Sequence, residues 1–314
     1  MLAHPCGSCS YSWEEENVRP NFLIVGAPKC GTTAMWRYLQ QHPDIFLSPR
    51  KDMHYFGSDL DFRVRTRFSK DEYEAFFSDS KEQARGEASV WYLFSKNAAE
   101  EIYEYDPNMN IIIMLRDPIP LMYAHYTQMR LNALGDEDIS TFEEALAAEP
   151  ARKRGQRIPK HNTLPSALLY TEIGRLSVQI QRYLDVFPQE QILFLFQEDM
   201  GKNMEAVYRQ TLDFLGVDQN HQTSFARVNT HKEIRFEWMR TLIGATPQSL
   251  KSLLPPKRRA RLSRWLRRVN MKHAKRPKLD PEFEKKLRTQ FSSEIDALSA
   301  IVGRNLDHWK HREL

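Results

Sequence analysis

The sequence predicts an α/β fold, a three-layer sandwich in which helices flank a central, mostly parallel sheet. Two observations support this prediction. Short apolar runs alternate along the chain with longer segments of helical periodicity, which is the pattern of βα units around a parallel sheet. The first apolar run, at 22–25, also leads directly into a glycine-containing loop at 26–33 that opens a helical segment. A chain of 314 residues is long enough to form one such domain with appendages.

Three apolar runs bounded by turn or charged residues are the clearest strands, at 22–25, 111–115 and 192–196. Helical patterns separate them and are expected to form the outer layers, at residues 32–41, 98–105, 140–148, 168–186 and 204–215. Residues 149–163 combine Pro150, Gly155 and Pro159 with basic side chains and predict a long surface loop.

The division of the chain follows from these elements. We expect a tail at 1–20 and a single domain at 21–314, made of a core at 21–235, a basic segment at 255–278 and a C-terminal helix at 280–306. No stretch approaches the roughly 18 apolar residues of a membrane span. The first twenty residues contain no apolar run of signal-peptide length. With only three cysteines in the chain, which fits a reducing compartment, we expect a cytoplasmic protein.

The basic segment is densest at 257–278, where eleven of 22 residues are Lys or Arg and none is Asp or Glu. Its apolar residues, among them Leu262, Trp265 and Val269, recur at helical spacing. Such a helix could lie on an anionic membrane, guide an acidic substrate, or pack its apolar stripe on the domain. Aromatic residues are not interleaved with the charges as stacking platforms, so we expect no nucleic-acid partner.

The loop at 26–33 has the composition of a phosphate cradle. Two glycines let the backbone curl so that amide N–H groups point inward, and the helix that follows adds its positive dipole end. The loop also supplies a cationic side chain and two hydroxyl groups. The pattern therefore predicts that the following residues bind an anionic ligand: Lys29, Cys30, Gly31, Thr32 and Thr33.

The position of the lysine separates this loop from that of the ATP and GTP hydrolases. Their pattern GxxxxGK[ST] has lysine directly after the second glycine. Here Lys29 precedes Gly31 by two residues and Thr32 follows it. A P-loop nucleotide kinase or NTPase is therefore kept only as an alternative.

Residues 26–33 match the pattern GxxKxGTT and resemble the 5'-phosphosulfate loop of the sulfotransferases that use 3'-phosphoadenosine-5'-phosphosulfate (PAPS). A second resemblance follows the strand at 111–115, where Arg116, Asp117 and Pro118 match the Arg-Asp-Pro block of that family. The resemblance implies a P-loop-type fold and a 3'-phosphate bound by Arg116, whose guanidinium can engage it bidentately. A rival interpretation makes Asp117 a magnesium ligand of a Walker B strand, but the neighbouring arginine would oppose the metal.

Two positions depart from the family pattern. The family usually has an arginine five residues after Arg116 and a phosphate-binding serine eight residues after it, where this chain has Leu121 and Ala124. The lost hydroxyl costs on the order of 1 to 3 kcal/mol of binding unless another group, such as that of Thr127, replaces it. A non-catalytic binding protein that kept the fold is therefore a second alternative.

The segment at 51–56 resembles the part of heparan-type sulfotransferases that carries the proposed base, a glutamate. The resemblance implies that Asp52 is the base and that Lys29 stabilises the leaving oxygen. Because Asp52 is shorter than glutamate, either the acceptor approaches more closely or His54 shares the proton transfer. The resemblance also implies later 3'-phosphate contacts from Lys232 or Arg235, and a family-like Gly-Glu segment at 86–92.

We therefore expect a sulfotransferase that uses PAPS and no metal ion. It would move a sulfuryl group to a hydroxyl or amine of an acceptor, either a carbohydrate or a glycosylated small molecule.

Overall fold

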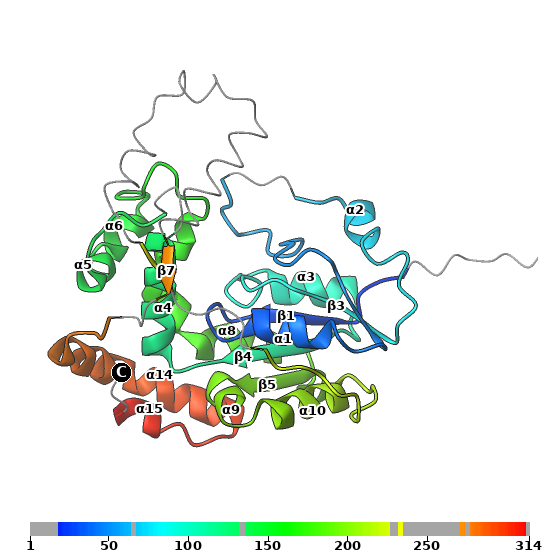
Figure 1. Cartoon of the computed structure of the whole chain (residues 1–314). Helices are drawn as coiled ribbons and strands as arrows, with labels where there is room; N and C mark the ends of the chain where they lie inside the picture. Colours follow the sequence, from blue (N-terminus) through cyan, green and yellow to red (C-terminus); the bar gives the residue numbers. More distant parts are fainter. Residues whose placement is uncertain are drawn as a thin grey trace, which may run out of the picture.

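The computed structural model describes residues 18–63, 67–131, 136–226 and 277–311, together with the backbone of two short strands at 232–234 and 271–273. A five-stranded parallel sheet lies at the centre, in the order β2-β3-β1-β4-β5 (Figure 1). Its strands are β1 (Phe22–Gly26), β2 (Ile45–Leu47), β3 (Ala84–Ala88), β4 (Asn110–Leu115) and β5 (Ile192–Phe196). Every residue of β1 is buried, as expected for a parallel strand covered on both faces.

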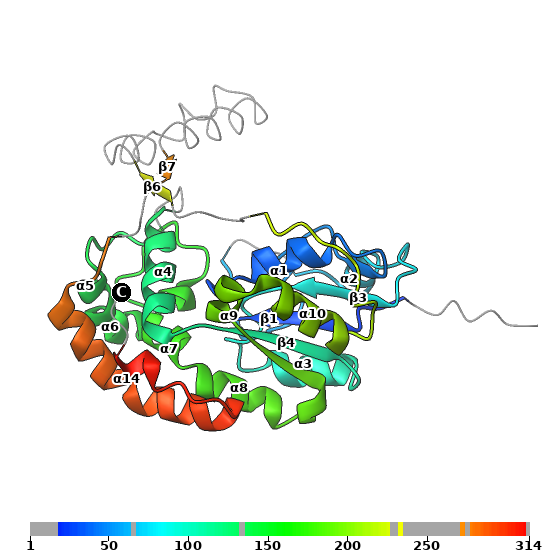
Figure 2. The ribbon, with the colours of Figure 1, turned by 60° about the horizontal axis from the view of Figure 1, so that its bottom comes forward.

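Helices cover both faces of this sheet. One face carries α1 (Thr32–Leu39) and α10 (Met204–Phe214), and the other carries α3 (Ala98–Tyr105) and α8 (Leu176–Leu184), as Figure 2 shows. The predicted α/β three-layer fold is confirmed. The strands expected at 22–25, 111–115 and 192–196 are β1, β4 and β5, each within one residue of the expected bounds.

Two expectations about the elements were wrong. The segment 168–186 is not one helix but a 3-10 turn, Pro165–Leu168, followed by α7 (Tyr170–Gly174) and α8. The backbone of Arg175, with ψ 71°, leaves the helical region and separates α7 from α8. The surface loop expected at 149–163 begins with helix α6 (Glu149–Lys153), because Pro150 lies in its first turn, where the missing N–H has no intrahelical partner to lose.

A group of helices stands beside one end of the sheet. Helix α4 (Pro118–Leu131) leaves the carboxyl end of β4 and packs on α7, with α5 (Phe142–Ala147) and α6 beyond it (Figure 1). A fully buried ion pair between Glu137 and Arg152, 2.8 Å, joins the segment after α4 to α6. The carboxyl ends of the strands and α4 thereby surround the region where ligands bind in open α/β sheets.

The C-terminal helices are attached to this framework by packing on α8 and by ion pairs. Helix α14 (Pro281–Val302) is capped by Asp280, ends at the left-handed Gly303, and is followed by α15 (His308–His311). Arg288 of α14 forms a buried ion pair with Asp117, 2.9 Å. Arg304 pairs with Glu198 and Asp199 on α9 (Gln197–Lys202).

The remaining elements are helix α2 (Lys70–Glu74), a 3-10 turn at Gln189–Gln191, and a strand pair. Strands β6 (Lys232–Ile234) and β7 (Met271–His273) pair antiparallel, and β6 lies beside α4 (Figure 2). No helix within the described ranges has the length and apolar character needed to cross a membrane.

Candidate active site

The predicted phosphate loop connects β1 to α1 and turns at Gly31. The φ of Gly31 is 97°, in the left-handed region, and a Cβ there would lie 3.1 Å from the sulfur of Met200. Glycine is therefore needed both for the backbone conformation and for the close approach of α9. The N–H groups of Thr32 and Thr33 open α1 and have no acceptor within the helix. The loop thus has the shape and polarity of an anion cradle.

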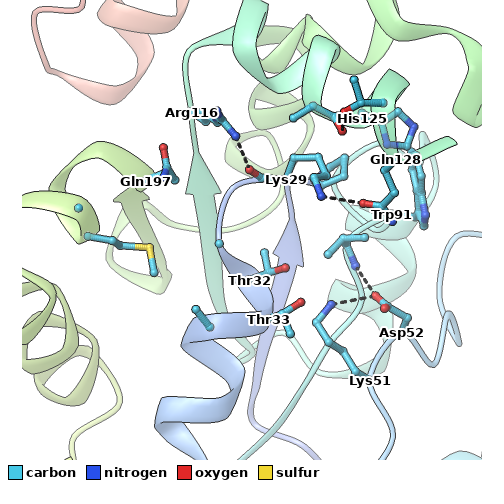
Figure 3. Close-up of a pocket in the computed structure, with 18 of the residues that line it drawn as sticks. Lys29, Thr32, Thr33, Lys51, Asp52, Trp91, Arg116, His125, Gln128 and Gln197 are labelled. Carbon is cyan, nitrogen blue, oxygen red and sulfur yellow. Dashed lines mark hydrogen bonds and ion pairs between the residues drawn. The ribbon is translucent and has the colours of Figure 1, made fainter. Parts of the chain in front are cut away.

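This loop forms one wall of a pocket of about 820 Å³. Figure 3 shows Lys29 between Arg116 on one side and Asp52 with Lys51 on the other. The predicted site residues that line the pocket are Lys29, Gly31, Thr32, Thr33, Asp52, His54 and Arg116. The structure therefore brings the predicted anion-binding and proton-transfer groups to a single cavity.

Cys30 does not contribute its side chain to this pocket. Its thiol is fully buried and donates to the Pro28 carbonyl, with sulfur and oxygen 3.5 Å apart. Burial raises the pKa of the Cys30 thiol to about 12, so the group is neutral at physiological pH. Only the backbone of Cys30 is available to a bound anion.

Arg116 and Asp117 are adjacent in the chain but lie in different environments. Arg116 follows β4, lines the pocket, and donates from Nη1 to the carbonyl of Lys29, 3.2 Å away. The carboxylate of Asp117 is buried outside the pocket, where it accepts from the N–H of Ile119 and pairs with Arg288. Asp117 is thus committed to the packing of α14, which contradicts its alternative interpretation as a magnesium ligand.

The ammonium group of Lys29 lies on the pocket side of the loop. It donates to Oε1 of Gln128 on α4, 2.7 Å away. A side chain on α4 therefore sets the position of the loop cation. Sequence reasoning did not identify Gln128, because 99 residues separate it from Lys29 and no motif links them.

The two positions that depart from the family pattern, Leu121 and Ala124, both belong to α4. Ala124 lines the pocket, whereas Leu121 is fully buried and does not. Thr127 also lines the pocket, and its hydroxyl donates to the Ala124 carbonyl, 3.1 Å away. A replacement of the missing serine by Thr127 stays a prediction.

Asp52 lies at the side of the pocket opposite Arg116. Its Oδ1 pairs with Nζ of Lys51, 3.1 Å, and lies 3.4 Å from the N–H of Val90. Among the described residues, its Oδ2 has no hydrogen-bond partner. With a side chain that is 41% exposed, Asp52 can accept a proton from a group that enters the pocket.

His54 is buried, with its ring 4.6 Å from that of Phe62. The described residues include four non-glycine positions with positive φ, and three of them are predicted site residues: Lys29 (65°), Asp52 (58°) and His54 (52°). Left-handed backbone at such residues costs about 1 to 3 kcal/mol each and persists only where surrounding contacts enforce it. Strained backbone therefore coincides with the predicted catalytic groups.

His125, which the sequence did not indicate, also lines the pocket. Its Nε2 lies 2.9 Å from the carbonyl oxygen of Ala167 and must carry the proton of the neutral ring, because a carbonyl can only accept. Burial, with a smaller contribution from the charge of Lys29, lowers the pKa of His125 to about 4, although the hydrogen bond to Ala167 opposes this shift. His125 is consequently neutral at physiological pH.

Other wall residues that sequence reasoning missed are Tyr38, Gln197 and Met200. Trp91, which belongs to the family-like Gly-Glu segment at 86–92, lines the pocket as well.

Two predicted ligands of the 3'-phosphate could not be placed. Lys232 belongs to β6, whose side chains are not described, and Arg235 lies outside the described residues. The basic segment 257–278 also lies outside them, apart from the backbone of β7 and residues 277–278. Its suggested contact with an anionic membrane or an acidic substrate stays a prediction.

The described part of the chain contains no group of three or more His, Cys, Asp or Glu side chains arranged to hold a metal ion. The expected metal-free reaction stays a prediction.

Comparison with known proteins gives the family. Residues 19–298 match the model of the sulfotransferase domain, so the chain belongs to the sulfotransferase domain family. This confirms the resemblance seen in the loop at 26–33 and in the block that follows β4.

Individual relatives agree with this assignment. Human carbohydrate sulfotransferase 15 is 25% identical over 248 residues, which cover 63% of this chain and 44% of that protein. Human bifunctional heparan sulfate N-deacetylase/N-sulfotransferase 3 is 26% identical over 244 residues, 74% of this chain and 27% of that protein. The chain thus spans less than half the length of these relatives. The crystal structure of a sulfotransferase from Alicyclobacillus acidocaldarius superposes with a TM-score of 0.69 and 28% identity, over 93% of this chain and 99% of the other.

Proposed function

We propose that this protein transfers a sulfuryl group from PAPS to a hydroxyl or amine of a carbohydrate-type acceptor. The observation that carries the proposal is the common pocket of the loop cation Lys29, the arginine Arg116 and the carboxylate Asp52. Membership of the sulfotransferase domain family supports the reaction type. The names of the relatives, a carbohydrate sulfotransferase and a heparan sulfate N-sulfotransferase, support the acceptor class.

The donor end of PAPS fits the chemistry of the loop. The phosphosulfate would lie against the first-turn N–H groups of α1 and the hydroxyls of Thr32 and Thr33, where the helix dipole favours negative charge. Arg116 would bind the 3'-phosphate, because it lies beside the loop and keeps its charge at any physiological pH.

The transfer is an in-line displacement at sulfur. The acceptor oxygen or nitrogen forms a bond to sulfur, and the bond between sulfur and the bridging phosphate oxygen breaks. Asp52 takes the acceptor proton on Oδ2, and His54, two residues further along the chain, also lines the pocket. Lys29 stabilises the negative charge that develops on the leaving oxygen of 3'-phosphoadenosine-5'-phosphate (PAP).

Titration calorimetry with PAP, compared with ATP and Mg²⁺, tests the donor site. We expect micromolar PAP binding, with ATP at least about tenfold weaker because it lacks the 3'-phosphate. Lys29→Ala and Arg116→Ala should abolish PAP binding. Arg209→Ala, which removes an exposed cation on α10 outside the pocket, should leave it unchanged. Preference for ATP, or no PAP binding, would overturn the donor assignment.

Transfer of labelled sulfate from PAPS to desulfated heparin and chondroitin oligosaccharides tests the reaction itself. Turnover identifies an enzyme. PAP binding with no transfer to any hydroxyl or amine acceptor would favour the non-catalytic alternative. The cytoplasmic location expected from the sequence stays a prediction.

A further inference from the structure

The segment that carries Asp52 and His54 has no regular secondary structure, although both residues adopt left-handed backbone. Two of its N–H groups donate to side chains that follow β3. The N–H of His54 donates to Oγ of Ser89, 3.1 Å, and the N–H of Tyr55 donates to the hydroxyl of Tyr92, 2.8 Å. The N–H of Asp52 donates to the backbone carbonyl of Ala88, 2.8 Å, so the two hydroxyl groups hold the part of the segment that follows Asp52.

Both hydroxyl groups are bound in turn by one carboxylate. Glu87 on β3 is fully buried, and it accepts from Oγ of Ser89 at Oε2, 2.8 Å, and from Tyr92 at Oε1, 2.6 Å. The hydroxyl of Tyr73 on α2 also donates to Oε1, 3.2 Å. Within the described ranges no lysine or arginine pairs with Glu87.

The direction of these hydrogen bonds matters. An ionised carboxylate only accepts, so it directs the protons of Ser89 and Tyr92 toward itself. The lone pairs of the two hydroxyls are then left to accept from the N–H groups of His54 and Tyr55. A neutral amide in place of the carboxylate donates as well as accepts, so at least one hydroxyl proton has to turn away and compete with the backbone N–H.

We propose that Glu87 is a positioning residue for the reaction: it orients Ser89 and Tyr92 so that they hold the backbone of His54 and Tyr55, which directly follows Asp52 and Met53. The assignment of Asp52 and His54 to the reaction rests on the proposed function. The hydrogen-bond role of Glu87 is independent of it.

The cost of keeping this carboxylate supports a dedicated role. Burial raises the pKa of Glu87 to about 7, while the hydrogen bonds from Tyr92, Ser89 and Tyr73 oppose that shift. The titratable groups that face it are Tyr73 from α2, Tyr92, and Asp52, whose charge is the smallest contribution to the raised pKa of Glu87. An apolar or amide side chain would avoid the penalty of burying a charge. Measurements at pH 8 examine the carboxylate form.

Amide hydrogen exchange of the protein without ligand tests the arrangement at residue resolution. In Glu87→Gln we expect exchange at the His54 and Tyr55 amides to rise at least about tenfold, with the amides of β1 unchanged. Ser89→Ala should affect mainly the His54 amide, and Tyr92→Phe mainly that of Tyr55. Tyr73→Phe is the matched control, since it also removes a phenol that donates to Oε1 but makes no hydrogen bond to the segment.

Two outcomes of the exchange measurement would overturn the inference. One is exchange in Glu87→Gln within about twofold of the wild type at both amides. The other is equal acceleration in β1, which would mean that Glu87 stabilises the whole domain instead of the segment.

Kinetics separate positioning from donor binding. With desulfated heparin oligosaccharides as the acceptor probe, Glu87→Gln should lower kcat about tenfold or more and leave the KM for PAPS within about twofold. Unchanged kcat in an active protein would contradict the positioning role. Failure of the wild type to bind PAP would sink the proposed function alone, because the exchange measurement needs no ligand.

Discussion

The Nζ of Lys29 donates a hydrogen bond to Oε1 of Gln128, 2.7 Å away, so the loop cation is held by helix α4. To reach the leaving oxygen of a bound donor, the ammonium group has to exchange this partner for the substrate. The hydrogen bond is partly exposed, and its acceptor, the Gln128 amide, carries no charge. Replacing it by a contact with the substrate therefore costs little compared with breaking a buried ion pair.

Lys29→Met should therefore be far more damaging than Gln128→Met. We expect loss of the charge to lower kcat about a hundredfold or more, because positive charge at the leaving oxygen acts mainly in the transition state. Gln128→Met keeps the cation and should lower kcat less than about tenfold. Steady-state transfer from PAPS measures both. Equal losses would show that the position of the lysine matters more than its charge.

Asp52→Asn tests the proposed base. Removal of a general base typically costs about 10² to 10⁴ in rate, so we expect a fall of at least a hundredfold in kcat, with PAP affinity retained. His54→Asn should have the smaller effect, because the His54 ring is buried while Asp52 is exposed to the pocket. A larger loss in His54→Asn would transfer the role of base to the histidine.

His125 should make stability depend on pH. Its pKa in the folded protein, about 4, lies below the ordinary value of 6.5, so the unfolded chain binds more protons between these values. The free energy of unfolding contributed by this group is complete above pH 6.5 and is lost as the pH falls toward 4, by at most about 3 kcal/mol.

Urea unfolding of the wild type and of His125→Gln from pH 7.5 to 4.5 measures this contribution. Glutamine can still donate to the Ala167 carbonyl, so the two curves should converge as the pH falls. Glu87 affects the pH dependence of stability in the opposite direction. Because its pKa is raised in the folded protein, its contribution to the free energy of unfolding falls as the pH rises from 4.5 to 7. The difference between the two proteins cancels Glu87 and isolates the histidine. Parallel curves would contradict the prediction.

Arg288→Met should destabilise the protein strongly. It removes the guanidinium that pairs with the buried carboxylates of Asp117 and Glu284, a loss of about 3 to 5 kcal/mol in the free energy of unfolding. The control Arg209→Met removes an exposed pair with Glu205, and it should cost less than about 1 kcal/mol. Chemical denaturation distinguishes the two, and similar losses would refute the distinction.

The phosphate loop could be predicted from the sequence because its chemistry is local. Strand, glycines, lysine and helix start are contiguous, and the spacing of Lys29 before Gly31 already separated the loop from that of the NTPases. Arg116 could be predicted for the same reason, as it directly follows an apolar strand.

The rest of the site depends on contacts between distant parts of the chain. Gln128 is an ordinary helix residue until α4 places it at the loop. The role of Glu87 depends on the hydrogen bonds of the His54 and Tyr55 amides to Ser89 and Tyr92, which lie 35 and 37 residues further along the chain. The sequence left Asp117 with two interpretations, since its partner Arg288 comes 171 residues later. Helix 168–186 was expected to be continuous because its apolar period hides the break at Arg175.

Helix α14 lines no part of the pocket, yet its Arg288 pairs with Asp117, the residue next to Arg116. Arg304, which follows the helix, pairs with Asp199 on α9, and Met200 of the same helix lies against Gly31. A random mutagenesis screen scored only for activity would therefore mark two distant stretches of the sequence, the loop at 26–33 and residues 284–304. The second cluster would look like another active site on a linear map. It would be told apart because its variants lose heat resistance together with activity, while a variant of a pocket-facing loop side chain such as Lys29→Met loses activity alone.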